Sequence, residues 1–261
     1  ERIARARPGD GAADAPRAPA AARSADFRTG GDAYARYRPD YPPELAGRLA
    51  DACTATGIAL DVGCGTGQLA TVLAERFDHV VATDVSTDQL AHAAAHPDID
   101  FREGAAEALP VDDGSVDLVV AAQAAHWFDL DRFYPEVRRV ARPGAVVALV
   151  SYGVPYIESP ANAVFQRFYW QELPPFWPPQ RHHVETGYAD LSFPFEPLAP
   201  PELFIRERWP LAAFLGYLGT WSASRQAVAR GRADLFDALA AELRRHWGDP
   251  ETPRPVVWPL A

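Results

Sequence analysis

The sequence of 261 residues predicts an α/β fold, in which helices cover both faces of a doubly wound, mostly parallel sheet. First, short apolar runs alternate with stretches of helical periodicity from about residue 42 to residue 151. Second, some of these runs end in glycine or aspartate, at the edge where such sheets place their loops. Third, prolines and aromatic residues cluster after Tyr152, which predicts an insertion that caps the sheet.

The first half of the chain supplies most of the expected elements. Leu45 and Leu49 lie at helical spacing after a Pro-Pro pair, so a helix is expected over 42–55. Ser86 and Gln89 form a capping-box pair at the start of another helix. The further expected elements are, in chain order, a strand over 58–62, a helix over 68–77, a strand over 80–84, a helix over 86–95, strands over 99–102 and 116–121, a helix over 130–140 and a strand over 145–151.

The second half is less regular. Prolines and aromatic residues replace the alternation over 152–201, where we expect irregular structure. Later elements are expected as a strand over 203–209, helices over 211–218 and 233–247, and a final strand over 256–258. The expected plan is a flexible tail over 1–25 and a single domain over 26–261, made of a core over 26–151, a cap over 152–201, and C-terminal strands and helices over 202–261.

Composition argues against some partners. The net charge is −10 and no arginine-rich stripe is present, so counterion release has little to drive and no nucleic-acid partner is expected. No apolar run approaches the ~20 residues of a membrane-spanning helix, so no membrane partner is expected. Cys53 and Cys64 show neither disulfide-framework nor metal-ligand spacing. We predict a reduced, cytoplasmic setting and a monomer or homodimer.

Three glycines mark the turn after the strand over 58–62. Gly63, Gly65 and Gly67 allow positive φ angles and let a ligand lie directly against the backbone. About twenty residues later, the next strand ends at Asp84, where a carboxylate accepts hydrogen bonds from both ribose hydroxyls of an adenine nucleoside. A nicotinamide dinucleotide also requires a carboxylate for its ribose, but the glycine turn of the proteins that bind it has the spacing G-x-G-x-x-G. The spacing here is G-x-G-x-G, which disfavours a dehydrogenase.

Further segments follow this turn in a fixed order. They are EGAAEALP over 103–110, SVDLV over 115–119 and RRVARPGA over 138–145, after DVGCGTG over 61–67 and Asp84. In order and spacing, over about residues 26–151, they resemble the motifs of class I S-adenosylmethionine-dependent methyltransferases, which have a Rossmann-like fold. YARYRPDYP over 34–42, AQAAHWF over 122–128 and GTWS over 219–222 resemble the branch of trans-aconitate methyltransferase-like proteins.

The resemblance implies S-adenosylmethionine as the cofactor and S-adenosylhomocysteine as its product. It implies that Asp61 and the glycine turn hold the methionyl part, that Asp84 holds the ribose, and that Arg38 pairs with the cofactor carboxylate. The expected cofactor-binding residues are Tyr34, Arg38, Asp61, Gly63, Cys64, Gly65, Gly67, Gln68, Asp84, Val85, Ala105, Ala106, Glu107 and Gln123. Many relatives have Asp where this chain has Ala105, so adenine recognition is expected to rest on backbone near Ala106 and on apolar packing by Val85 and Leu109.

The expected reaction is methyl transfer to a small molecule, with a carboxylate or a natural-product oxygen as acceptor. His126 is the candidate general base, and a structural role through hydrogen bonds is the alternative. Glu107 is either a catalytic carboxylate or a side chain that fixes its loop. Cys64 is expected to be a small filler, because methyl transfer from a sulfonium needs no covalent enzyme intermediate. No metal is expected, since no other ligand stands at metal spacing from the adjacent histidines at 182 and 183.

Aromatic residues of the cap have no obvious core to fill, because the parallel sheet has its own helices. We expect about half to pack locally and the others to face the acceptor. The expected substrate-contacting residues are Tyr37, Trp127, Tyr152, Trp170, Trp177 and Trp221. Arg181, His182 and Arg167 are the cations within reach of an anionic acceptor. The alternative function is a cofactor-binding scaffold without methyl transfer, such as a cyclase-like or binding protein.

Overall fold

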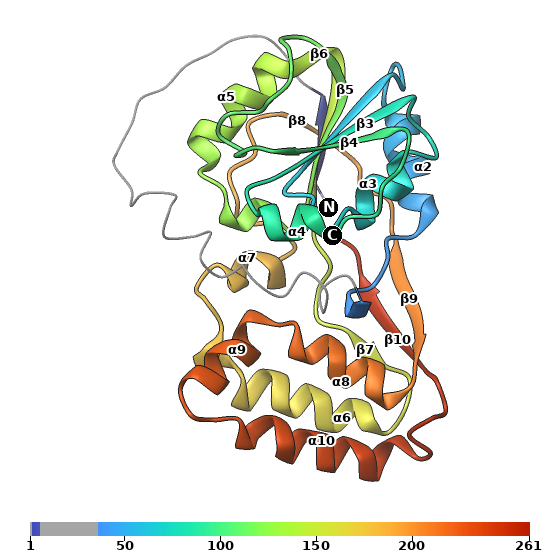
Figure 1. Ribbon diagram of the computed structural model, residues 1–261, viewed down its shortest axis with the longest axis vertical. Helices are drawn as coiled ribbons and strands as arrows, with labels where there is room; N and C mark the ends of the chain where they lie inside the picture. The colour runs from blue at the N-terminus through green and yellow to red at the C-terminus, as the bar shows by residue number, and fades with distance from the viewer. Residues whose placement is uncertain (1, 6–35) are drawn as a thin grey trace.

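The computed structural model describes residues 2–5, by their backbone, and residues 36–261. Its main sheet has seven strands in the order β4-β3-β2-β5-β6-β1-β8 (Figure 1). The bounds are β1 (Arg2–Arg5), β2 (Ile58–Val62), β3 (His79–Asp84), β4 (Ile99–Glu103), β5 (Val116–Ala122), β6 (Ala141–Val150) and β8 (Glu196–Leu198). Neighbouring strands from β4 to β6 pair in parallel, so the predicted doubly wound sheet is confirmed.

Helices cover both faces of this sheet. They are α2 (Pro43–Ala52), α3 (Gln68–Leu73), α4 (Thr87–Ala91) and α5 (Leu130–Val140). Successive strand residues point to opposite faces, so Ala59 and Leu118 pack with residues of α2 and α3. Leu60 and Val119 pack with residues of α5 on the other face, and Figure 1 shows these helices on opposite sides. Burial on both faces explains why the strands read as continuous apolar runs.

Three parts of the sheet differ from the prediction, and one of them is β8, which lies in the stretch expected to be irregular. β6 begins at Ala141 rather than at 145, because the expected turn at 142–144 is an irregularity within the strand, where Gly144 has a φ of 83°. Residues 2–5, expected in a flexible tail, form β1, which pairs antiparallel with β6 and β8. The backbone groups of an outer strand favour such pairing. Residues 6–25 of the expected tail lie outside the described residues.

A second layer adjoins the carboxyl edge of the sheet, where the chain leaves β6 (Figure 1). Its elements are β7 (Tyr156–Ile157), α6 (Ala161–Arg167), η4 (Phe168–Glu172), η5 (Pro174–Phe176), α7 (Arg181–Glu185), β9 (Phe204–Trp209), α8 (Leu211–Gly219), α9 (Ser222–Ala229), α10 (Asp234–Trp247) and β10 (Arg254–Pro259). The strand predicted at the C-terminus exists as β10, but it pairs with β7 and β9 in a separate sheet.

The prediction of irregular structure over 152–201 is wrong for α6, η4 and α7, and for the shorter elements β7, η5 and β8. Val164, Phe165 and Phe168 form a buried helical face, and α6 packs against α10. Pro160 and Pro174 flank this helical stretch and therefore bound it rather than break it.

One apolar cluster joins the two layers. It includes Leu118 of β5, Phe165 of α6, Phe214 of α8 and Trp258 of β10, all fully buried. The second layer is therefore held against the sheet by a shared core. Among the described helices, none is long and apolar enough to cross a membrane.

Candidate functional site

The glycine turn joins β2 to α3 at the carboxyl edge of the sheet. Gly63, Gly65 and Gly67 have φ angles of 73°, 59° and 87°, in the left-handed region that favours glycine. A Cβ on Gly63 would lie 2.6 Å from the Cβ of Ala124, and one on Gly67 would lie 2.8 Å from the ring of Phe101. The turn is glycine-rich because both its dihedral angles and its close contacts exclude side chains.

A cavity of about 330 Å³ opens beside this turn. Of the residues predicted to bind the cofactor, those that line it are Arg38, Asp61, Gly63, Cys64, Gly65, Gln68, Asp84, Val85, Ala105, Ala106, Glu107 and Gln123. Gly67 does not line it and instead caps α3 in a left-handed conformation. Tyr34 lies outside the described residues. The fold thus brings together residues that are up to 85 positions apart, from Arg38 to Gln123.

Sequence reasoning missed several residues of the cavity wall. Tyr41, Gln89 and Phe128 line it as well. The capping-box pattern accounts only for the backbone of Gln89, whose N–H donates to Ser86 Oγ over 3.3 Å. Its side-chain Oε1 is buried without a hydrogen-bond partner, as is Nε2 of Gln68. The position of Gln89 in the first turn of α4, directly after Asp84, was the available signal.

Asp61 provides the most unusual electrostatics of the cavity. Its carboxylate is buried, and neither oxygen has a hydrogen-bond partner. Burial, reinforced by the neighbouring negative charge of Asp84, raises the pKa of Asp61 to about 7, against a smaller opposing effect of the Ala70 N–H, which does not reach hydrogen-bond geometry. A buried carboxylate without a partner is costly to the unliganded protein. The arrangement suits a cationic group of a ligand.

Asp84 is held in place at the end of β3. Its Oδ2 accepts a hydrogen bond from Gly65 N over 2.9 Å, and its Oδ1 accepts one from Ser86 N over 2.8 Å. Burial raises the pKa of Asp84, and these backbone donors act in the opposite direction. Each oxygen keeps a lone pair for a further donor.

Arg38 and Gln123 both contact Tyr152 at the cavity wall. Arg38 Nη1 donates to Tyr152 Oη over 2.9 Å, and its guanidinium lies 5.5 Å from the ring centre of Tyr217. Gln123, with a φ of 54°, donates from Nε2 to the carbonyl of Tyr152 over 2.9 Å. A cation and a phenol therefore meet at the cavity wall.

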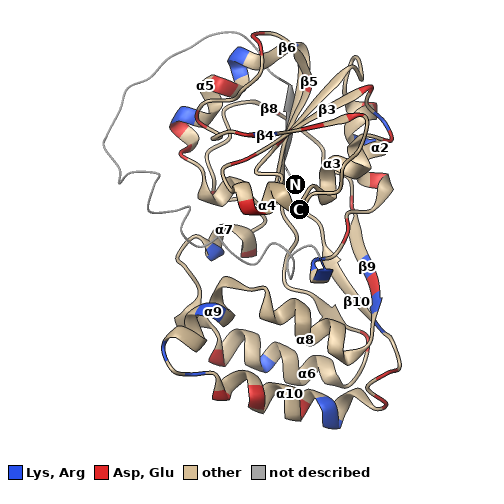
Figure 2. Cartoon of the chain, viewed as in Figure 1, with Lys and Arg blue, Asp and Glu red and all other residues tan. Residues whose placement is uncertain are grey.

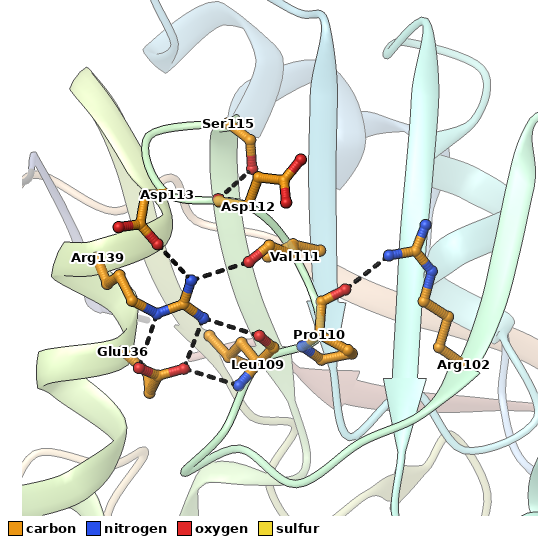
Figure 3. Close-up of polar contacts among 9 residues, drawn as sticks. All are labelled: Arg102, Leu109, Pro110, Val111, Asp112, Asp113, Ser115, Glu136 and Arg139. Carbon is orange, nitrogen blue, oxygen red and sulfur yellow. Dashed lines mark hydrogen bonds and ion pairs between the residues drawn. The ribbon is translucent and has the colours of Figure 1, made fainter.

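The loop that carries Ala105 and Ala106 is clamped from α5. Figure 3 shows Arg139 donating to the carbonyls of Leu109 and Val111 over 2.8 Å and 2.9 Å. Glu136 Oε2 accepts from Leu109 N over 2.8 Å, and the two α5 side chains also pair with each other. Glu107 Oε1 accepts from Asp129 N over 2.8 Å, which is the loop-fixing alternative for this residue. This wall of the cavity is thus positioned by side chains of α5.

Replacement of Arg139 by Met is expected to lower the free energy of unfolding by about 1–2 kcal/mol, because several charge-assisted bonds to the loop are lost at a partly exposed position. Urea denaturation measures it. Arg102→Met is the control, since Arg102 bonds the loop through a single carbonyl, that of Pro110. Equal losses in the two variants would contradict a clamp centred on Arg139.

His126 does not line the cavity. It lies in η3 (Ala125–Trp127), and its Nδ1 is 2.9 Å from Tyr188 Oη. Burial, with the nearby charges of Arg181 and His183, lowers the pKa of His126 to about 3. The imidazole is therefore neutral near pH 7 and a weak base. These observations favour the structural alternative over the general-base hypothesis, whereas the adjacent Trp127 does line the cavity.

His126→Gln is expected to make stability less dependent on pH. The pKa of this group is lowered on folding, so the unfolded chain binds more protons between pH 3 and the ordinary value of 6.5. The contribution of His126 to stability is fully present above about pH 6.5, and it is lost as the pH falls toward 3. Urea titrations at pH 5 and pH 7.5 measure the difference. A variant with an unchanged difference would show that His126 is not the group responsible.

Comparisons with known proteins address the family. A family model described as a methyltransferase domain matches residues 60–149. The chain is 49% identical to a candidate type II methyltransferase of Anaeromyxobacter dehalogenans, whose solved structure superposes with a TM-score of 0.81 over 86% of this chain and 96% of that one. The chain belongs to the methyltransferase family. The matched segment of this methyltransferase runs from β2 to β6 and contains the glycine turn and Asp84.

Two curated relatives extend the comparison. The methyltransferase is 29% identical to a candidate methyltransferase of Dictyostelium discoideum, over 80% of this chain and 81% of the relative. It is 47% identical to an uncharacterized methyltransferase of Mycobacterium tuberculosis, over 49% of this chain and 52% of that protein. This second match spans about half the length of the relative. The predicted trans-aconitate methyltransferase-like branch stays a prediction.

The aromatic residues predicted to face the acceptor are not all in the cavity wall of this methyltransferase. Trp127 and Tyr152 line it, whereas Tyr37, Trp170, Trp177 and Trp221 do not. Trp170 is 53% exposed, and Trp221 is buried in the shared core. Trp221 is thus one of the aromatic residues that pack in the core, which the second layer shares with the sheet.

The adjacent histidines of α7 are bound to a carboxylate. His183 Nδ1 is 2.8 Å from Asp190 Oδ2, and His182 Nε2 is 3.6 Å from the same oxygen. Over the described part of the chain, no group of three or more His, Cys, Asp or Glu side chains is arranged to hold a metal ion.

Proposed function

We propose that this methyltransferase binds S-adenosylmethionine in the cavity beside the glycine turn and transfers its methyl group to a small molecule. The observation that carries the proposal is the buried, unpartnered carboxylate of Asp61. The methionyl part of the cofactor bears an ammonium group, which is the kind of partner that a buried carboxylate requires. Asp84, with a free lone pair on each oxygen, stands where the ribose hydroxyls would be held.

The remaining groups fit the same cofactor. Arg38 lies at the cavity wall and supplies a guanidinium for the cofactor carboxylate. Val85 is half exposed at the cavity, and we assign it and the backbone near Ala106 to the adenine. The half-exposed state of Val85 is explained if a ring covers it. When bound, the cofactor supplies an activated methyl group on a sulfonium.

The protein then has to hold the acceptor in line with that methyl group and exclude water. Orientation of this kind supplies roughly 7–11 kcal/mol of the barrier. We propose a carboxylate or a natural-product oxygen as the acceptor. A carboxylate needs no general base, which agrees with a neutral, weakly basic His126 outside the cavity. A cytoplasmic setting and a monomeric or homodimeric state are part of the same proposal.

Calorimetry with S-adenosylhomocysteine and with NAD tests the cofactor. We expect binding of the first and none of the second, and the reverse result would overturn the proposal. Incubation with methyl-labelled S-adenosylmethionine and a metabolite extract then tests the reaction. A labelled small molecule is expected, whereas cofactor binding without any transfer would favour a scaffold that lacks methyl transfer.

A further inference from the structure

Arg181, the first residue of α7, is a largely buried cation with unused donors. Its side chain is 17% exposed and lies over the ring of Trp177, 4.6 Å from the ring centre. Its Nε donates to Tyr169 Oη over 2.9 Å and lies 3.7 Å from Glu185 Oε1. No residue of the described chain accepts a hydrogen bond from its two terminal nitrogens. The forked end of the guanidinium is therefore open to an anion.

A second donor in the same cluster is unused. The indole Nε1 of Trp177 is buried and has no hydrogen-bond partner. The rings of Trp177 and Trp221 are tilted against each other with centres 5.3 Å apart, and Tyr169 meets Trp221 edge-on at 5.7 Å. Buried donors without partners are rare in folded proteins and call for an explanation. This unpartnered N–H and the open guanidinium end of Arg181, which lies over the same indole ring, point to one ligand that accepts from both.

The cluster lies next to the cofactor cavity. α7 packs against η3, whose last residue, Trp127, lines the cavity. On the other side, Trp221 meets Tyr217 at 5.3 Å, and the cavity residue Arg38 lies over the same Tyr217 ring. Figures 1 and 2 show α7 between the sheet and α9. The charge of Arg181 reaches both sides, because it acts to lower the pKa of His126 and of Tyr217.

We propose that Arg181 and the indole N–H of Trp177 form a subsite for a carboxylate of the acceptor. The proposal rests on the proposed function, since it names the chemical class of the molecule that is methylated. Arg38 serves the carboxylate of the cofactor, so each of the two cations has its own anion. Tyr169 and Glu185 are positioning residues: Tyr169 Oη donates to Glu185 over 2.5 Å and accepts from Arg181, which fixes the direction of the fork.

Carboxylate binding to the complex with S-adenosylhomocysteine tests the subsite. The probes are phenylacetate and succinate, compared by calorimetry with their uncharged amides, phenylacetamide and succinamide. We expect the carboxylates to bind more tightly than the amides, and Arg181→Met to remove this preference with a loss on the order of tenfold or more. Trp177→Phe keeps the ring and loses the N–H, so a smaller loss is expected. Arg167→Met, at a cation paired with Glu242 on the surface, is the matched control.

The outcomes separate the subsite from the proposed function. Equal binding of acids and amides, no binding of either acid, or an unchanged preference in Arg181→Met and Trp177→Phe would overturn the subsite. Affinity for S-adenosylhomocysteine is expected to stay the same in all three variants, because none of these residues lines the cofactor cavity. A wild-type protein that does not bind S-adenosylhomocysteine would count against the proposed function, and the acids are then titrated into the protein alone. If Arg181 had only a structural role, Arg181→Met would lower the melting temperature and leave the ratio of acid affinity to amide affinity unchanged.

Discussion

Asp61→Asn is expected to weaken the binding of S-adenosylhomocysteine by about 2–5 kcal/mol, which is roughly thirtyfold to several thousandfold. The carboxylate is buried without a partner, so the ligand ammonium would be its first counter-charge. An amide has no charge to offer and directs two N–H donors at the same place. Calorimetry at pH 8 measures the loss.

The same carboxylate predicts how binding depends on pH. The pKa of Asp61 is raised to about 7 in the folded, unliganded protein, and the ammonium requires the ionised form. Affinity is therefore expected to fall by about tenfold for each pH unit below 7 and to level off above it. In Asp61→Asn the profile is expected to be flat between pH 5.5 and 8. A wild-type profile that is equally flat would contradict the assignment of the ammonium to Asp61.

The stability of the unliganded protein provides a control, because its dependence on pH through Asp61 has the opposite sign to that of binding. Because the folded pKa of Asp61 lies above its ordinary value of 3.8, the folded state binds more protons than the unfolded state between these values. This group therefore stabilises the protein below about pH 4, and its contribution is lost as the pH rises through 7. Asp61→Asn is expected to make the unliganded protein more stable at pH 8, so lost binding cannot be attributed to unfolding. Asp100→Asn, in a surface ion pair with Arg102, is the matched control.

Gly63→Ala is expected to lower the free energy of unfolding by about 2–5 kcal/mol and to damage the cofactor turn. The φ of 73° costs an alanine roughly 1–2 kcal/mol. The new Cβ would also lie 2.6 Å from the Cβ of Ala124 and 3.3 Å from the ring of Phe128, which adds about 1–3 kcal/mol of overpacking. Urea denaturation and calorimetry with S-adenosylhomocysteine measure the two effects.

Gly114→Ala separates the two causes. Gly114 has a φ of 57°, and nothing lies within 4 Å of a Cβ built on it. It therefore shares the dihedral cost and lacks the clash, so it is expected to lose only about 1–2 kcal/mol. If the two variants were equally destabilised, the close contact of Gly63 with Ala124 would contribute nothing to the loss of stability.

Local pattern was sufficient for the parallel strands of the sheet and for one side of the cavity. The apolar runs that became β2, β3 and β5 are buried on both faces, so their composition alone marks them as strands of a covered parallel sheet. The glycine turn and Asp84 follow those strands directly in the chain. Because parallel strands end at one edge, their order in the sequence already places them together.

Tertiary packing decided the rest. Periodicity reports which face of a segment is apolar but not what covers it, so β10 could be recognised as a strand while its partners, β7 and β9, could not. Trp221 was expected at the acceptor and lies in the core, because α6, α8 and α10 pack around it in the apolar cluster that joins the second layer to the sheet. The clamp of Arg139 on the carbonyls of Leu109 and Val111, and the open fork of Arg181 beside Trp177, depend on contacts between segments that no local pattern relates. Sequence alone determined the edge of the sheet at which the cofactor is proposed to bind, and the folded chain decided which cations and donors stand around it.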